Sequence, residues 1–221
     1  MDDIVVIDNV VEQVLQDSLE KALLGHSVPW HFVPDITHND RSSVLMITRR
    51  MGFSYILYNK ESSRPASPRL RFLAPICFEA VRRVGLTLAE ITQCRAFLQL
   101  PDNMPPEASR VNNPHVDSPM PHTVVLYYPH DAQGDTVIYE QTLDDVPYIP
   151  KDQKKPVAWT EKQRVPPKKG RAVVFNGNRY HSSSNPFAGP RCVLNFNFTN
   201  PEQQQHWQQT KATRINPVAN R

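Results

Sequence analysis

The sequence predicts a mainly β fold with flanking helices, in which an N-terminal α/β segment precedes a sandwich or barrel of short strands. Its 221 residues include 21 prolines and only 7 glycines, which favours short strands joined by shaped loops. Hydrophobic residues make up 39% of the chain, enough for a folded domain with a substantial core. From residue 95 onward, β-branched runs alternate with turn residues, which is typical of sandwiches and barrels rather than of βα repeats.

The first 94 residues are expected to form strands and helices that support the β region. A strand is predicted from Ile4, and an amphipathic helix follows over residues 8–25. Asp8 or Asn9 is its expected cap, and Gly25 its expected end. A second strand and a second helix are predicted at residues 53–58 and 70–86.

The β region contains five short runs of strand-forming residues separated by turns. They lie at residues 95–100, 123–128, 135–141, 171–176 and 191–198. The remaining residues at the C-terminus are polar, so we expect this tail to be partly disordered. We therefore divide one structural domain into a supporting segment, a β core and a tail, at residues 1–94, 95–200 and 201–221.

Composition restricts the surroundings and the partners of the chain. The net charge of +3 is too small for the whole surface to bind nucleic acid, although a nucleic-acid substrate stays open. Three scattered cysteines argue against a disulfide framework or a zinc knuckle and predict a reducing, cytoplasmic location. No run approaches the roughly 18 apolar residues of a membrane span, and the N-terminus does not resemble a signal peptide. The oligomeric state is left open.

One short motif combines a histidine and an aspartate directly before a predicted strand. His115 and Asp117 are two residues apart, so in extended backbone their side chains share a face. An imidazole and a carboxylate are two of the three ligands of a 2-His-1-carboxylate iron site. A second pair of this kind, His38 and Asp40, lies before the β region, where a loop is the expected structure.

A third candidate ligand lies downstream, close to an arginine. His181 and Arg191 are ten residues apart across a turn-rich segment, which predicts an antiparallel hairpin that turns both side chains towards one cavity. Arginine binds a carboxylate through two parallel hydrogen bonds, which lysine cannot do. The set predicts a metal together with an anionic cosubstrate.

The stretch from about Arg95 to Phe198 resembles the Fe(II)/2-oxoglutarate-dependent dioxygenases, in particular the prolyl-4-hydroxylase-like branch. The matching pieces are HVD, LYY, GDTVIY, GRAVVF, His181, and Arg191 ten residues later. The resemblance implies a double-stranded β-helix core (a jelly roll, cupin-like), Fe(II), 2-oxoglutarate as cosubstrate, O2, and ascorbate as reductant. It implies that His115, Asp117 and His181 are the iron ligands. A carboxylate at Asp117 implies hydroxylation, with release of succinate and CO2, rather than halogenation.

The resemblance also implies which residues bind the cosubstrate. Arg191 would bind its distal carboxylate, together with Tyr128, the second residue of the YY pair. Leu126 shares a face with Tyr128 by strand alternation and would line the same pocket. The chain departs from the family pattern at two positions of the cosubstrate site. At Val193 the expected substitute is Asn195, and near Leu100 it is Gln99.

Other candidate residues concern the substrate, for which a peptide (including a prolyl peptide) or a small molecule is expected. His122 is a candidate for the substrate mouth, or else a loop residue. Residues 146–171 hold eight Lys or Arg and two acidic residues, so we expect a solvated loop or a lid at the iron end. Trp159, in this segment, would pack it down or stack on a substrate. Two other classes stay open: a cupin-like metal enzyme without 2-oxoglutarate, and a non-catalytic jelly-roll binding module.

Overall fold

The computed structural model describes residues 4–36, 51–62, 65–101, 111–147 and 157–215. Its strands are β1 (Ile4–Ile7), β2 (His31–Val33), β3 (Gly52–Asn59), β4 (Glu90–Gln99), β5 (Thr123–Tyr127), β6 (Thr136–Thr142), β7 (Glu161–Val165), β8 (Ala172–Asn176), β9 (Arg179–Ser183) and β10 (Arg191–Thr199). Its helices are α1 (Gln13–Leu24), α2 (Leu70–Arg83) and α3 (Pro201–Ile215). The mainly β jelly roll with flanking helices that the sequence predicted is confirmed.

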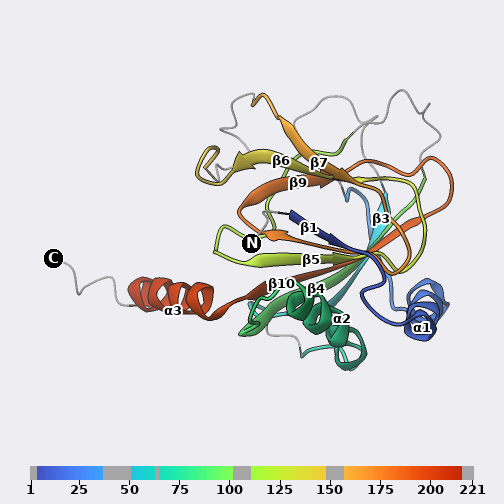
Figure 1. Cartoon of the computed structure of the whole chain (residues 1–221), viewed down its shortest axis with the longest axis horizontal. Coiled ribbons are helices and arrows are strands. Elements are labelled where there is room, and N and C mark those ends of the chain that lie inside the picture. Colours follow the sequence, from blue (N-terminus) through green and yellow to red (C-terminus); the bar gives the residue numbers. More distant parts are fainter. Residues whose placement is uncertain (1–3, 37–50, 63–64, 102–110, 148–156, 216–221) are drawn as a thin grey trace.

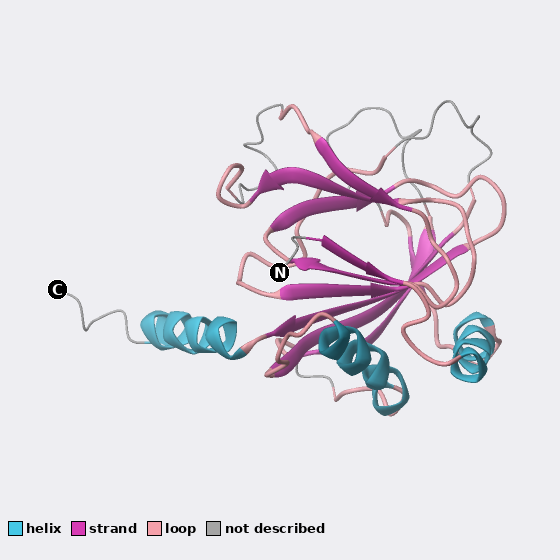
Figure 2. Ribbon diagram, in the orientation of Figure 1, coloured by secondary structure: helices cyan, strands magenta, loops and turns pink. Residues whose placement is uncertain are grey.

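The strands form two antiparallel sheets that face each other. The large sheet has seven strands in the order β1-β8-β5-β10-β4-β3-β2, and the small sheet has three in the order β7-β6-β9. Figure 1 and Figure 2 show the small sheet as one layer, the large sheet as the next, and α1 and α2 beyond the large sheet. Among the described strands, no pairing joins the two sheets, so they do not close into a barrel.

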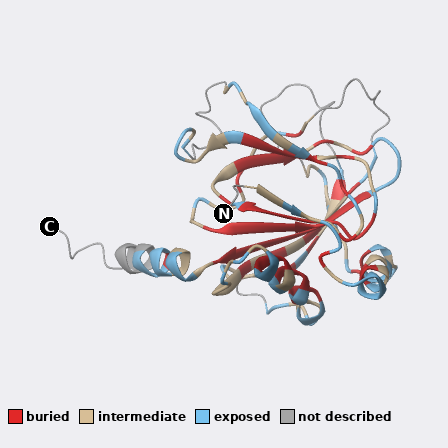
Figure 3. Ribbon diagram, viewed as in Figure 1, coloured by how far each residue is buried: buried red, intermediate tan, exposed pale blue. Residues whose placement is uncertain are grey.

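Strand alternation divides the apolar side chains into three layers. Val125, Tyr127 and their neighbours on one face of the large sheet pack against α1 and α2. On the opposite face, Val124, Leu126 and Tyr128 point towards the small sheet, as predicted for this strand. The outer face of the small sheet carries a separate cluster. In Figure 3 the buried residues concentrate on the strands of the two sheets.

The N-terminal helix is shorter than expected, and it is not capped as expected. It begins at Gln13 after Glu12, which makes no side-chain capping hydrogen bond. Asp8 instead forms ion pairs with Lys168 and Arg171, at 2.9 and 2.7 Å. Asp8 therefore forms ion pairs with residues distant in the sequence and does not cap α1 as predicted.

The basic segment at residues 146–171 is not a single loop. It contains β7, which pairs with β6 and widens the small sheet. Near its end, Lys169 contacts both Asp17 and Glu20 of α1 at 2.6 Å. Lys169 is thus held against α1, whereas two other lysines of this segment, Lys154 and Lys155, lie outside the described residues.

Most of the C-terminal tail is helical, whereas residues 216–221 lie outside the described residues. Residues 201–215 are helical, and the Trp207 indole donates to the Pro121 carbonyl at 2.8 Å. This contact attaches α3 to the loop that precedes β5. Cys77, Cys94 and Cys192 are free thiols in the core. Within the described part of the chain, none of the helices has the length and apolar character to cross a membrane.

Candidate metal and cosubstrate site

His115 and His181 are joined through their backbones. Each amide donates to the other's carbonyl at 2.9 Å, which forms an isolated antiparallel bridge. His181 belongs to β9, whereas His115 lies in the segment that approaches β5 and is not part of that strand, which begins only at Thr123. The extended backbone predicted for His115 and Asp117 therefore comes from this bridge and not from β5. Val116 points to the outer cluster, and the residues on either side of it point inwards.

The three ligand-type side chains converge on one point. The candidate ligand atoms of His115, Asp117 and His181 lie within 4.8 Å of one another. Asp117 Oδ2 is 3.9 Å from His181 Nε2, and the centroids of the two imidazole rings are 4.6 Å apart. No other group of at least three His, Cys, Asp or Glu side chains in the described residues is close enough to hold a metal ion. His38 and Asp40, the second pair in the sequence, lie outside the described residues.

Both imidazoles are set up as neutral ligands. Burial lowers the pKa of His115 to about 4, and it also lowers the pKa of His181. Nδ1 of His115 is 3.3 Å from the Asn113 carbonyl, and Nδ1 of His181 is 3.4 Å from the Arg179 carbonyl. If Nδ1 carries the proton in each ring, Nε2 keeps its lone pair for a metal.

Asp117 supplies the negative charge. Burial alone would raise the pKa of its carboxyl group, but the positive charge of Arg95, together with the hydrogen bond from Asn195, opposes burial, and this pKa lies well below its usual range. Arg95 Nη2 is 2.7 Å from Asp117 Oδ1. The side chain is therefore a carboxylate at neutral pH, and the donor set fits a divalent cation such as Fe(II).

Arg191 faces this group from the other sheet, so the predicted hairpin is wrong. His181 belongs to β9 in the small sheet, and Arg191 is the first residue of β10 in the large sheet. The two strands are not paired; they lie on opposite sides of the interior. Both residues nonetheless line the same cavity, because the inward faces of the two sheets oppose each other.

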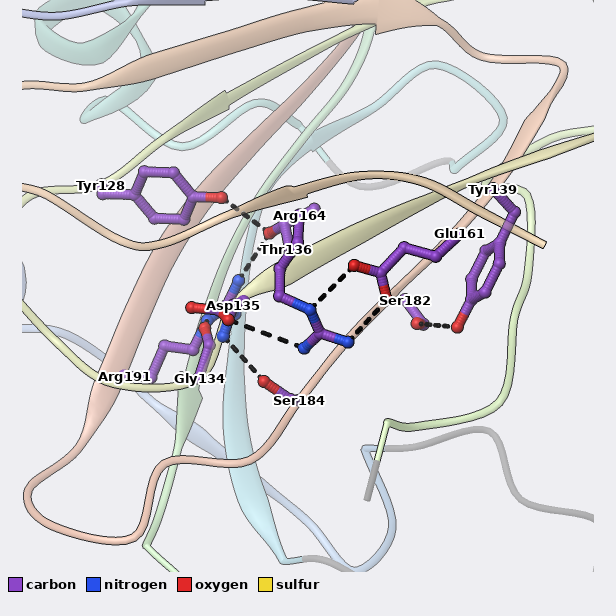
Figure 4. Close-up of polar contacts among 10 residues, drawn as sticks. All are labelled: Tyr128, Gly134, Asp135, Thr136, Tyr139, Glu161, Arg164, Ser182, Ser184 and Arg191. Atoms are coloured by element: carbon purple, nitrogen blue, oxygen red, sulfur yellow. Dashed lines mark hydrogen bonds and ion pairs between the residues drawn. The ribbon is translucent and has the colours of Figure 1, made fainter. Parts of the chain in front are cut away.

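Neutral oxygens surround the Arg191 guanidinium (Figure 4). It donates to Gly134 O at 2.5 Å and to Thr136 Oγ1 at 2.9 Å. It also donates to Gln99 Oε1, which Figure 4 does not draw, at 2.9 Å. Its side chain is buried, with 2% of the residue exposed, yet in the described part of the chain no carboxylate forms an ion pair with it. Asp135, beside Thr136, pairs with Arg164 instead, at 3.6 Å. A buried cation without a counter-ion is costly, so this position favours an anionic ligand.

The cavity between the sheets has a volume of about 80 Å³. It is lined by the three ligand-type residues at one part and by Arg191, Thr136 and Gln99 at another, so a single ligand can reach both. Apolar side chains complete the wall, among them Leu126, Val193 and Phe97.

Tyr128 and Gln99, the residues predicted to bind the cosubstrate with Arg191, lie beside it. The Tyr128 hydroxyl donates to Thr136 Oγ1 at 2.6 Å, the same oxygen that accepts from Arg191. Gln99 accepts from Arg191 and donates to Ser183 Oγ at 2.8 Å. Asn195 lines the same cavity, where its amide donates to Asp117 Oδ2 at 2.9 Å.

The two substrate candidates do not reach the cavity. His122 is 0% exposed, with Nδ1 2.7 Å from the Met120 carbonyl, so it is not at the mouth. Trp159 packs against Tyr139 and Tyr180, with ring centroids 5.5 and 4.8 Å away, on the outer face of the small sheet. His181 points the opposite way from this face, so a substrate near the metal ligands would not contact Trp159.

Sequence reasoning missed Arg95 and Thr136 as site residues. Arg95 shares a strand face with Gln99 by alternation, which could have indicated it. Thr136 lies within the GDTVIY piece, but its role depends on the approach of Arg191 from the other sheet. Ser183, two residues after His181, also lines the cavity and was not identified.

Comparisons with known proteins support the resemblance that the motifs indicated. No family model and no curated protein matches the sequence. A 2OG-Fe(II) oxygenase from Burkholderia pseudomallei is 15% identical with a TM-score of 0.56, covering 89% of this chain and 85% of that chain. A Trichoplax adhaerens prolyl hydroxylase, in complex with a hypoxia inducible factor peptide fragment, is 12% identical with a TM-score of 0.54, covering 93% and 87%.

A third solved structure shows that this fold supports more than one reaction. SnoN, the non-heme alpha ketoglutarate dependent epimerase from nogalamycin biosynthesis, is 13% identical with a TM-score of 0.57, covering 90% of this chain and 79% of that chain. Fold alone therefore does not specify hydroxylation. The chain has the jelly-roll fold of the 2OG-Fe(II) oxygenases, with a His-Asp-His cluster and a buried arginine facing one cavity.

Proposed function

We propose that this chain is a non-heme Fe(II) and 2-oxoglutarate-dependent dioxygenase. His115, Asp117 and His181 hold the iron in this proposal, and Arg191 binds the distal carboxylate of 2-oxoglutarate. The iron and the cosubstrate together supply the activation of O2, with release of succinate and CO2. Ascorbate serves as the reductant that keeps the iron in the Fe(II) state.

The observation that carries the proposal is the buried charge of Arg191 in the same cavity as the candidate metal ligands. A ligand that satisfies both parts needs a carboxylate at one end and chelating oxygens at the other. 2-Oxoglutarate has this shape. A metal site without a cosubstrate gives no reason for a buried arginine that has no ion-pair partner among the described residues.

The residues around the cavity have separate tasks under this proposal. Thr136 and Gln99 hold the Arg191 guanidinium in place, and Tyr128 fixes the Thr136 hydroxyl. Leu126 and Val193 are buried side chains of the cavity wall, and they limit access of water. A dry surrounding strengthens the pairing between Arg191 and a carboxylate.

We propose hydroxylation of a peptidyl substrate (including a prolyl one) or of a small molecule. Asp117 supports hydroxylation, because relatives that halogenate carry a small residue in place of this carboxylate. The neighbours include both a prolyl hydroxylase in complex with a peptide fragment and an enzyme of nogalamycin biosynthesis, so both substrate classes are to be tested.

The decisive experiment measures succinate from purified protein supplied with Fe(II), ascorbate, O2 and 2-oxoglutarate. We expect slow uncoupled succinate formation that depends on iron and is lost in His181→Ala. Metal binding without 2-oxoglutarate binding would favour the cupin-like enzyme, and binding of neither would favour a non-catalytic module. Adding cell extract and searching for products 16 Da heavier by mass spectrometry then identifies the substrate.

A further inference from the structure

Arg95 and Asn195 hold the two oxygens of Asp117 from neighbouring strands. The two residues are directly opposite each other in the register of β4 and β10. Arg95 Nη2 is 2.7 Å from Asp117 Oδ1, and Asn195 Nδ2 is 2.9 Å from Asp117 Oδ2. Asp117 itself lies in a segment outside the named strands, so these two contacts connect it to the large sheet.

The pair of Arg95 and Asp117 is nearly closed off from solvent. The Asp117 side chain is 4% exposed and the Arg95 side chain is 18% exposed. Arg95 also lies over the Phe97 ring, with its guanidinium carbon 5.2 Å from the ring centroid. The arginine is therefore supported on one side by an aromatic ring and directed at the carboxylate, an arrangement that restricts its own rotamers.

A carboxylate that binds a metal must present a chosen oxygen in a chosen plane. Two donors, one on each oxygen, restrict rotation of the Asp117 side chain, and only one of them carries a charge. The contact from Arg95 is charge-assisted, which makes it the stronger of the two contacts that hold Asp117.

We propose that Arg95 is a positioning residue for the metal site, which fixes the orientation of Asp117. The inference rests on the proposed function, since it assumes that Asp117 is a metal ligand. Arg95 acts through Asp117, and the register of β4 against β10 sets its place. It differs from a residue that only stabilises the fold, because its loss should change the coordination of a bound metal.

The test uses metal-free full-length protein titrated with Co(II) under anaerobic conditions, with the visible absorption spectrum as readout. Arg95→Gln should lower Co(II) affinity by about 10- to 100-fold, the range for residues that orient ligands. It should also alter the Co(II) spectrum. Arg83→Gln is the matched control, because Arg83 pairs with Glu79 on the surface of α2 and should leave both readouts unchanged.

Arg95→Lys provides a second variant if Arg95→Gln does not fold by circular dichroism. It keeps the charge but loses the planar group, so it should bind Co(II) less tightly than the parent, with an altered spectrum. A folded variant at position 95 that matches the parent in affinity and spectrum would overturn the inference. If the parent itself binds no Co(II), the proposed metal site fails instead, which separates the two outcomes.

Discussion

His115 and His181 are connected by two backbone hydrogen bonds of 2.9 Å, one in each direction. The bridge sets the spacing of the two imidazoles independently of any metal. Because both hydrogen bonds are between backbone atoms, replacing either histidine by another residue leaves them in place. The candidate ligands can therefore be tested one at a time in a protein that keeps its fold.

Removal of the His181 imidazole should abolish tight metal binding. His181→Ala keeps the backbone bridge but leaves only two ligands, so Fe(II) or Co(II) affinity should fall by more than the roughly 100-fold that ligand-orienting residues cost. Calorimetric titration measures this. His38→Ala is the control, because the pair His38 and Asp40 is the alternative in the sequence. Loss of metal in that variant, with the fold preserved, would show that the wrong pair was chosen.

The Arg191 pocket should determine affinity for 2-oxoglutarate. Arg191→Ala leaves a bound carboxylate without its partner, which typically costs about 2–5 kcal/mol, or roughly 30- to several thousand-fold in affinity. Tyr128→Phe should cost less, about 1–2 kcal/mol, and Thr136→Val about 1–3 kcal/mol by leaving two donors without their acceptor. Metal affinity should stay unchanged in all three. An unaltered 2-oxoglutarate affinity in Arg191→Ala would place the cosubstrate elsewhere.

Gly177 should tolerate no side chain while His122 is present. A Cβ atom there would lie 2.2 Å from His122 Nε2, inside a fully buried region. Gly177→Ala should therefore lower the free energy of unfolding by about 1–3 kcal/mol, as overpacking does. Combining it with His122→Ala should remove the overlap, so that the two costs are not additive in urea unfolding. Additive costs would show that Gly177 matters for another reason.

The metal-free protein should lose stability in mild acid. The pKa of His115 falls from 6.5 in the unfolded chain to about 4 in the folded one, so the unfolded state takes up its proton first. Its contribution is complete above pH 6.5 and is lost as the pH falls towards 4, on the order of 3 kcal/mol. His115→Gln should flatten this part of the stability curve. Parallel curves for the parent and His115→Gln would contradict the assignment.

Lys169 should contribute to stability and not to substrate binding. Lys169→Ser removes two ion pairs to α1, so the unfolding temperature should fall, and by less in high salt, because exposed charges are screened. Affinity for 2-oxoglutarate should be unchanged. Lys162→Ser, which removes a pairing with Glu140 of β6 and none with α1, is the control. A salt-dependent change in 2-oxoglutarate affinity would return this segment to a role at the site.

The sequence was informative wherever the physics is local. The alternation of apolar residues at Val124, Leu126 and Tyr128 gave the inward face of β5, because a strand has a period of two residues. The spacing of His115 and Asp117 gave their shared orientation for a similar reason. These features need only the neighbouring residues.

Features that depend on distant partners were not predictable in the same way. The ten residues between His181 and Arg191 are compatible with a hairpin and with a crossing between sheets, and only the packing of the whole core decides between them. The roles of Arg95 and Asn195 depend on the register of β4 against β10, and these two residues are 100 positions apart in the sequence. Asp8 looked like a helix cap because its basic partners are about 160 residues away.

The two halves of the candidate site belong to different layers of the molecule, and this has a mechanical consequence. Arg95 and Asn195 attach Asp117 to the large sheet, while His181 belongs to the small one, so a metal shared by these side chains would act as a cross-brace between the sheets. A dicarboxylate reaching from that metal to Arg191 would add a second brace. Binding of the metal, and then of the dicarboxylate, should each raise the unfolding temperature, because each ligand connects the two sheets of the folded state. The unfolding temperature should therefore report which ligands are bound.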